Sequence, residues 1–429
     1  MARTAAPFTY RPLNLGRWLV WTGFALALIL APKVFTSSLA LTMLSQMGYL
    51  IIICLSYNML LGQGGMLSFG HAVYTGLGAF IAIHAVNLAA DGQLPAPLIV
   101  VPLLGGLGGL LFAVLFGYVT TKKSGTTFAM ITMGLGELVA AMALMFPSFF
   151  GGEGGISGDR VYGAQPLGIS FGPQIQVYYL IAAYCFVCTA LMFAFTRTPL
   201  GRMLNAVRDN PERVEFIGYN TRLVRYIAFI IAGFFAGIGG GLAAINFEIV
   251  NAADSLNMVR SGSYLLFTFL GGAGFFFGPI IGAVLLVFAS ILLSELTKAW
   301  LLYLGLVFTL MVMYAPGGVA SIVAHNLRVA AHGKMKRLLA PYAGLLVTGA
   351  VALAGLAMLV EMTYHRQLNA ATGPEVQLMG YSLDTTAAGS WVLAAVLLVL
   401  GGAALWWVQR RFARAWGSIQ EEIAAIEKV

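Results

Sequence analysis

Runs of about 20 apolar residues recur along the whole chain, and a run of that length can cross a bilayer as one helix. Apolar residues make up 59% of the 429 residues, whereas soluble domains are about half apolar. Inside lipid every backbone polar group must be satisfied within the protein. Because the alternating pattern of membrane strands is absent, the sequence predicts an all-α, polytopic bundle of transmembrane helices.

We expect about twelve spans, some of them broken or re-entrant. The expected spans are 17–35, 39–61, 69–87, 97–119, 125–147, 174–195, 227–247, 263–277, 279–297, 300–315, 338–360 and 391–409. The short pair 263–277 and 279–297, whose ends meet at Gly278-Pro279, is the pair most expected to re-enter the bilayer rather than cross it.

The basic residues are unevenly divided between the loops. With the N-terminus in the cytoplasm, 19 of the 24 Lys and Arg residues fall in cytoplasmic segments and five fall outside. Short cytoplasmic loops of membrane proteins carry such an excess. We therefore expect cytoplasmic N- and C-termini, and we attribute the net charge of +8 to topology and not to nucleic-acid binding.

One segment, residues 196–226, is far more polar than the spans that flank it. It holds six of the 24 basic residues and three of the 16 acidic ones, although only 9% of the chain is charged. Such a segment cannot enter hydrocarbon cheaply, and its six arginines favour the cytoplasm. It is either a folded element that docks a partner or a solvated loop whose arginines only set topology.

The pattern within this segment predicts a rigid pair of short helices. Residues 200–208 suit one helix, Asn210 can cap a second, and Pro211 fits its first position. Gly218 is placed to end the second helix. Two acidic residues fall near its positive end, where the helix dipole favours negative charge: Glu212 and Glu215.

The segment resembles the cytoplasmic coupling loop of the branched-chain amino-acid ABC importer permeases, the LivM type, with a pattern like T-x-x-G-R-x-L-x-A-x-R-x-[ND]-x-x-x-A-E-x-x-G. The matching residues are Thr198, Gly201, Arg202, Leu204, Ala206, Arg208, Asn210, Glu215 and Gly218. Val214 stands where alanine is usual, and Pro211 is not typical. The family's loop inserts into an ATPase groove, which implies coupling roles here for Gly201, Arg202, Arg208, Asp209, Asn210, Pro211, Glu212, Glu215 and Gly218.

Three further segments resemble family motifs in the family's order. The first, 56–80, is similar to N-L-x-x-G-x-x-G-x-x-S-x-G-H-x-x-F-x-G-x-G-A, with Tyr74 where phenylalanine is common. The second, 151–157, resembles an outside glycine-pair loop and implies a binding-protein contact at Gly151, Gly152 and Glu153. The third, 269–283, resembles G-G-x-G-x-x-x-G-P-x-x-G-A. The resemblance covers about residues 17–325.

The resemblance implies a permease subunit of a binding-protein-dependent ABC importer in the bacterial inner membrane. Its expected partners are two cytoplasmic ABC ATPase subunits, a second related permease, a periplasmic solute-binding protein and the lipid bilayer. ATP and Mg would be bound by the ATPases and no cofactor by this chain. Branched-chain or related amino acids are the first expectation for the substrate, and urea, short amides or aromatic acids are the alternative.

The segment 56–80 would be unusual as a plain span, because each glycine weakens a helix by roughly 1 kcal/mol relative to alanine. A broken helix exposes backbone groups that can meet a polar solute only where they line a cavity. The alternative is close packing of small residues. The residues assigned to a path or gate are Asn58, Gly62, Gln63, Gly65, Ser68, His71 and Glu137.

Three residues expected inside the membrane could have structural roles: His71, His84 and Glu137. His71 and His84 could each hydrogen-bond a neighbouring carbonyl. Glu137 is the only acid expected deep in a span, and burying it unpaired is costly. It either faces a cavity or gate, or pairs with an arginine or backbone N–H.

Motifs for other functions are missing from the sequence. No G-x-x-x-x-G-K-[ST], H-E-x-x-H or G-x-S-x-G pattern occurs, so we expect neither nucleotide binding nor enzymatic activity. The three cysteines lie in apolar runs, which favours packing, and we expect no metal site. The competing class is a secondary transporter coupled to H⁺ or Na⁺, which would have no need of the helix pair in 196–226.

A domain boundary is expected near residue 325. Residues 1–325 would form the permease core. Residues 326–429 would form a C-terminal extension with a basic linker, two further spans and a cytoplasmic tail. The extension has no counterpart in the family core.

Overall fold

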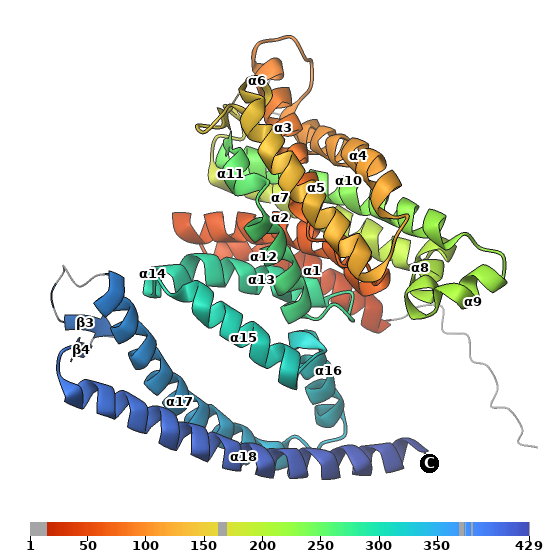
Figure 1. Cartoon of the computed structure of the whole chain (residues 1–429). Coiled ribbons are helices and arrows are strands. Elements are labelled where there is room, and N and C mark those ends of the chain that lie inside the picture. The colour runs from red at the N-terminus through yellow and green to blue at the C-terminus, as the bar shows by residue number, and fades with distance from the viewer. Residues whose placement is uncertain (1–14, 162–169, 369–372, 374, 379–380, 429) are drawn as a thin grey trace, which may run out of the picture. The chain divides into compact units, whose positions relative to one another are not determined.

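The computed structural model describes residues 15–161, 170–368, 373, 375–378 and 381–428 (Figure 1). The chain divides into two compact units, Met1–Val287 and Phe288–Val429. Both units are built of helices, and the described strands form two short antiparallel pairs. The expected helical membrane bundle is thus confirmed, whereas the boundary near residue 325 stays a prediction.

The elements of the first unit follow one another as α1 (Leu15–Val34), α2 (Ser38–Asn58), the π-helix η1 (Met59–Gln63), α3 (His71–Ala90), the 3-10 helix η2 (Leu98–Val100), α4 (Val101–Thr120), α5 (Gly125–Met145), α6 (Pro147–Phe150), β1 (Ile156–Ser157), α7 (Gln174–Arg197), α8 (Pro199–Asp209), α9 (Pro211–Phe216), α10 (Thr221–Phe247), β2 (Ile249–Val250), α11 (Ala252–Ser255), α12 (Met258–Gly271) and α13 (Gly278–Phe288).

The second unit continues with the π-helix η4 (Ala289–Leu293), α14 (Ser294–Leu296), α15 (Trp300–Tyr314), α16 (Gly318–Ala331), α17 (Lys336–Leu368), β3 (Glu375–Leu378), β4 (Tyr381–Asp384) and α18 (Ala388–Lys428). Within the described residues of the whole chain, nine helices are long and apolar enough to cross a membrane. A tenth is counted if α15 and α16, bent by 50°, form one span. The expected number of twelve is therefore not confirmed.

The expected span 263–277 differs most from the structure. Its helix, α12, has 14 residues and ends at Gly271, so it is about 21 Å long. The hydrocarbon core is about 30 Å thick. Gly278 and Gly282 of α13 pack against the backbone of Gly272 and Phe267, so α12 and α13 turn back on each other through a non-helical stretch.

Contacts within the first unit sort its helix ends into two groups. At one end, Arg208 of α8 contacts Gly62 of η1, and Arg222 of α10 contacts Tyr118 of α4. At the other end, Asn87 Nδ2 of α3 donates to Ser157 O of β1, which pairs with β2 beyond α10. The helices α3, α4 and α10 therefore run between the same two faces. The α8–α9 pair lies at one face and the β1–β2 pair at the other.

Glycine lets the central helices pack backbone to backbone. Gly237 of α10 lies against Gly105 of α4 and Gly78 of α3, and Gly109 lies against Gly233. A Cβ added at Gly237 would overlap the Gly105 carbonyl oxygen. Small residues drive this kind of close contact between membrane helices, which explains the glycine clusters inside apolar runs.

In the second unit, α17 and α18 form an antiparallel hairpin capped by the β3–β4 pair (Figure 1). Gly355 and Gly401 sit against the backbone of the facing helix. At one end, Glu361 of α17 accepts hydrogen bonds from the hydroxyls of Thr297 and Tyr303. At the other end, a cluster of buried side chains joins α16, α17 and α18: Val329, Leu338, Ile419 and Ile423.

Candidate coupling and translocation site

The polar segment between α7 and α10 folds into two short capped helices, as the sequence predicts. Thr198 Oγ1 accepts from the Gly201 amide at the start of α8, and Asn210 Oδ1 accepts from the Arg213 amide at the start of α9. Pro211 is the first residue of α9. Beyond its end, Gly218 adopts φ +88°, a left-handed conformation that suits glycine.

The buried face of this pair fixes it to the bundle. Gly201 packs so closely on the Phe195 carbonyl that a Cβ would overlap it. Leu204 and Val207 of α8 and Val214 of α9 are buried. The pair is therefore a rigid projection and not a solvated loop.

Two polar side chains of α8 bond directly to the π-helix η1. Arg208 Nη1 donates to the Gly62 carbonyl oxygen, and Asn205 Nδ2 donates to Gln63 Oε1 at 2.9 Å. Arg208 also pairs with Asp209 at 2.9 Å. The structure thus joins two groups of residues that the sequence assigned to separate roles, coupling and path. Sequence reasoning missed Asn205, although its position three residues before Arg208 places both on one helix face.

The rest of the helix pair presents a mixed surface. Glu215 Oε1 accepts from Thr221 Oγ1 at 2.7 Å and ties α9 to α10. Arg202 and Glu212 are exposed. Beside them, Phe216 is 89% exposed at the end of α9 and Ile217 is also exposed. This apolar tip was not identified from the sequence.

A surface pocket of about 440 Å³ lies beside the tip. Its walls come from the end of α7, from α8 and from the residue after α9: Arg197, Pro199, Arg202, Met203, Ala206 and Ile217. Apolar walls edged by two arginines suit an apolar side chain flanked by acidic groups.

The helix break predicted in 56–80 is present. The helix α2 passes into η1, which ends at Gln63. Gly65 then adopts φ +63°, and α3 begins only at His71. His71 Nε2 lies 2.9 Å from Ser56 Oγ, so its partner is a hydroxyl and not a carbonyl. The Tyr57 hydroxyl donates to Ser68 O at 2.8 Å. These bonds fold the connection back onto the end of α2.

Several polar atoms in the break are buried but unpaired. Among the residues that the structure describes, Asn58 Oδ1, Ser68 Oγ and His71 Nδ1 have no hydrogen-bond partner. Buried polar groups are normally satisfied, because an unmade hydrogen bond costs about 1–3 kcal/mol. The break therefore offers polar atoms to water or to a polar solute.

The helix α5 covers the break and carries Glu137. Thr132 Oγ1 of α5 accepts from the Phe69 amide at 3.1 Å. Glu137 is exposed, with no ion pair to any residue in the described part of the chain. The arginine partner considered from the sequence is thus not found there. His84, by contrast, lies 2.8 Å from the Phe149 carbonyl oxygen, which is the kind of partner that the sequence suggested for it.

At the opposite face, the loop after α5 carries the predicted binding-protein contact. Gly151 and Gly152 have φ +73° and +63°, backbone conformations that residues other than glycine rarely adopt. Glu153 is exposed beside them. The strand β1 then pairs with β2, with Ile156 opposite Val250.

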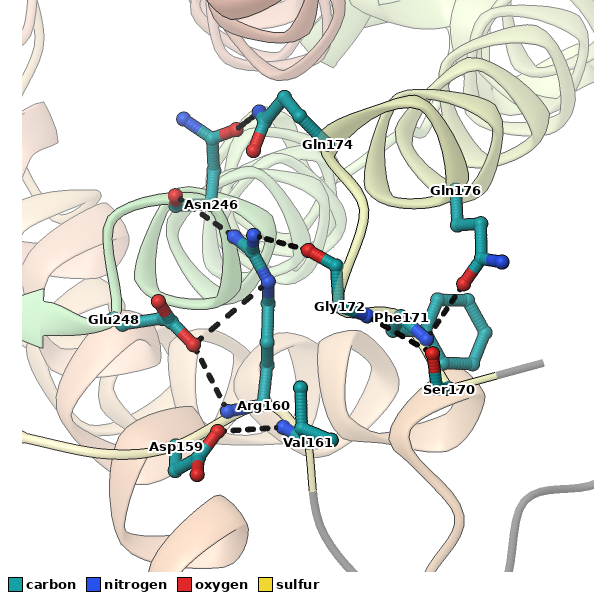
Figure 2. Close-up of polar contacts among 10 residues, drawn as sticks. All are labelled: Asp159, Arg160, Val161, Ser170, Phe171, Gly172, Gln174, Gln176, Asn246 and Glu248. Carbon is teal, nitrogen blue, oxygen red and sulfur yellow. Dashed lines mark hydrogen bonds and ion pairs between the residues drawn. The ribbon is translucent and has the colours of Figure 1, made fainter.

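Arg160 fastens this loop, as Figure 2 shows. Its side chain is 12% exposed and lies 3.7 Å from the Glu248 carboxylate. Nη2 donates to the Gly172 carbonyl at 2.9 Å, and the backbone N–H of Arg160 donates to Glu248 Oε1 at 3.1 Å. Gln174 donates to Asn246 Oδ1 at 2.8 Å beside it. One arginine thus holds together the loop and the ends of α7 and α10, a role that sequence reasoning did not assign.

Backbone strain gathers at this same cluster. Phe171 and Glu248 are the two non-glycine residues with positive φ in the described part of the chain, at 55° and 57°. Residues held in this region cost about 1–3 kcal/mol and persist only where the surroundings impose them. The cluster around Arg160 is therefore built to a fixed shape.

No group of three or more His, Cys, Asp or Glu side chains in the described residues could hold a metal ion. Cys54, Cys185 and Cys188 are buried and free.

The chain is similar in sequence to known transport proteins. The chain is 26% identical over 303 residues to the high-affinity branched-chain amino acid transport system permease protein LivM of Escherichia coli K12, which covers 65% of this chain and 69% of that protein. It is 21% identical over 246 residues to BraD, a permease protein of the same description from Pseudomonas aeruginosa, covering 55% and 78%.

A relative with a different printed substrate also matches. The galactose/methyl galactoside import permease protein MglC of Haemophilus influenzae is 23% identical over 273 residues, which cover 61% of this chain and 78% of that protein. No solved structure matches the chain significantly. The sequence profile of the family described as branched-chain amino acid transport system / permease component matches residues 39–316. The chain belongs to this family and is an inner-membrane permease subunit of an ABC importer.

Proposed function

We propose that this permease imports branched-chain or related amino acids, driven by two separate cytoplasmic ATPase subunits that bind ATP and Mg. A second, related permease would complete the pore, and a periplasmic binding protein would deliver the solute. The names of LivM and BraD support the substrate class. The same type of importer for urea, short amides or aromatic acids is the alternative, since MglC shows that related permeases serve other solutes.

The α8–α9 pair is the observation that carries this proposal. It is capped at both starts, anchored by buried Leu204 and Val214, and bonded to the broken helix. A rigid projection can transmit force, whereas a solvated loop cannot. ATPase closure would move it and tilt the bundle in alternating access. The backbone of this projection is shaped by Gly201, Pro211 and Gly218. Its exposed surface carries Arg202, Asp209 and Glu212.

The break between α2 and α3 supports a path or gate. Its unpaired buried atoms on Asn58, Ser68 and His71 could exchange hydrogen bonds with a polar solute. Glu137 is exposed on α5, and an ionisable group in a span usually faces a cavity or a partner helix and not lipid. We therefore place the helix break and Glu137 on the side that faces the solute path or the second permease.

The proposed orientation puts the α8–α9 face and both termini in the cytoplasm. The excess of Lys and Arg at that face supports it. The rigid loop with Gly151, Gly152 and Glu153 would then meet the binding protein outside. The extension 326–429 would brace the helices that precede it, since Glu361 and the cluster around Ile423 tie it to α15 and α16.

Co-purification and transport together test the proposal. The tagged chain, expressed with its neighbouring transport genes, should bring down two ATPase subunits and a second permease. In proteoliposomes, leucine uptake should need ATP inside and binding protein outside. A catalytically dead ATPase is the control. Uptake that a proton gradient drives without ATP would instead support a secondary transporter and overturn the proposal.

A further inference from the structure

We propose that Arg208 and Asn205 are positioning residues that transmit the movement of α8 to the π-helix η1, instead of contacting the ATPase. This inference rests on the proposed function and deepens it, because it names the element that receives the stroke. The sequence alone assigned Arg208 to ATPase coupling and Gly62 and Gln63 to the path. The structure places all three in one hydrogen-bonded junction.

The first link joins the charged side chain of Arg208 to the end of the π-helix η1. At the end of η1, the Leu60 carbonyl accepts from Gly64 and Met66, and the Leu61 carbonyl accepts from Gly65. The Gly62 carbonyl accepts from Arg208 Nη1. The last carbonyls of a helix lack partners within it and carry partial negative charge. A guanidinium is therefore well matched to this position, and moving it would leave the helix end open.

The second link is a pair of amides. Asn205 Nδ2 donates to Gln63 Oε1 at 2.9 Å and to the Gly201 carbonyl at 3.3 Å. Asn205 lies one turn before Arg208 on α8, so the two links grip adjacent residues of η1. Two bonds from one helix face restrict rotation as well as translation, which one bond would not.

Glycine brings the two elements within reach. A Cβ built on Gly65 would lie 2.8 Å from Arg208 Cγ, and one on Gly64 would lie 3.2 Å from Leu204 Cδ1. Gly62 is equally crowded, because a Cβ there would overlap the Ala273 carbonyl oxygen. The junction thus combines close packing with hydrogen bonds, and displacement of α8 cannot be absorbed by a gap.

The far side of the break is held by other helices. The Phe69 amide donates to Thr132 of α5, and the Ala72 amide donates to Ser261 of α12 at 2.9 Å. If α8 moved η1, residues 64–70 would therefore be distorted, because α8 holds one side of this segment and α5 and α12 hold the other. Single-turn π-helices often mark such functional sites. Ser68, which has an unpaired buried oxygen, lies in that segment.

The test measures coupling in the whole importer. Arg208→Gln and Asn205→Ala should still bring down the ATPases, but uptake per ATP hydrolysed should fall. We expect about a ten-fold fall for Arg208→Gln, which loses a charge-assisted hydrogen bond, and a smaller fall for Asn205→Ala, which loses a neutral one. Lys123→Gln, an exposed cation at the same face, should keep the wild-type ratio. The exchange Asn205→Gln with Gln63→Asn, which keeps the summed side-chain length, should recover most of the ratio that either single change loses.

The outcomes separate this inference from the function on which it rests. Unchanged uptake per ATP in Arg208→Gln and Asn205→Ala would overturn it, and so would loss of the ATPases from these variants alone, since that would make them docking residues. Failure of the wild-type chain to bring down ATPases would overturn the proposed function itself.

Discussion

Arg160 lies 3.7 Å from Glu248 and joins the loop after α5 to the end of α10, where Glu248 takes a left-handed φ of +57°. The ion pair is thus coupled to a strained backbone. The same arginine donates to the Gly172 carbonyl before α7. Three parts of the outer face depend on one side chain.

Replacing this arginine should loosen the outer face without unfolding the bundle. We expect Arg160→Ala to lower the free energy of unfolding by about 1–3 kcal/mol, because it leaves the Gly172 carbonyl without its donor and the Glu248 carboxylate without its ion-pair partner. Binding-protein-dependent uptake should fall as the loop loses its shape. Thermal unfolding in detergent measures the first effect. Lys33→Ala, which removes an exposed charge, is the control, and equal melting of both variants would contradict the role given to Arg160.

Alanine at Gly237 should disrupt the central packing. The added Cβ would overlap the Gly105 carbonyl of α4, and overpacking of this kind costs about 1–3 kcal/mol. The matched control is Gly134→Ala, since nothing lies within 4 Å of a Cβ there. That variant should gain up to about 1 kcal/mol from helix propensity. Melting temperatures of the two variants in the same detergent compare them, and a stable Gly237→Ala protein would show that the helices can move apart.

A cysteine at position 137 should react with water-soluble thiol reagents in the assembled importer. Glu137 is exposed on α5, and we assign that face to the solute path or to the second permease. Glu137→Cys should react about ten-fold faster than Leu138→Cys, the next residue around the helix, if only the former meets water. The native cysteines are buried, so they contribute little background. Equal, slow labelling of both would contradict a water-filled solute path at Glu137.

The end of α18 near Ile423 should be held in place more by the burial of apolar side chains than by ion pairs. Ile423 is fully buried against Val329 and Leu338, and its replacement by aspartate should cost about 2–5 kcal/mol locally. Glu422 pairs with Lys334 and Arg337 at the surface, and Glu422→Gln should cost less than about 1 kcal/mol. Trypsin cleavage near Arg410 and Arg411 reports release of the end of α18. Faster cleavage of Glu422→Gln than of Ile423→Asp would reverse this ranking.

Local signals in the sequence were sufficient for the helix pair. Thr198, Asn210 and Gly218 act through residues three positions away or less, so capping chemistry alone locates α8 and α9. The break after Gln63 is also a local effect, because glycine lowers helix propensity wherever it occurs. The structure shows α8, α9 and the break with nearly the expected bounds.

Long-range contacts could not be read from the sequence in the same way. The bond from Arg208 to Gly62 joins residues far apart in the chain, and the pairing of Arg160 with Glu248 depends on which helix ends share a face. The expected number of spans is not confirmed for a different reason. Hydropathy does not register that α12 stops at Gly271, because the residues after it are just as apolar.

Labelling of the tip of α9 tests the central claim, that an ATPase grips this projection from the cytoplasm. A single cysteine replacing Phe216, which is 89% exposed, should react with a membrane-impermeant maleimide in inside-out vesicles and not in intact spheroplasts. Assembly with the ATPases should protect it. Labelling from the outside, or undiminished labelling in the assembled complex, would contradict the claim.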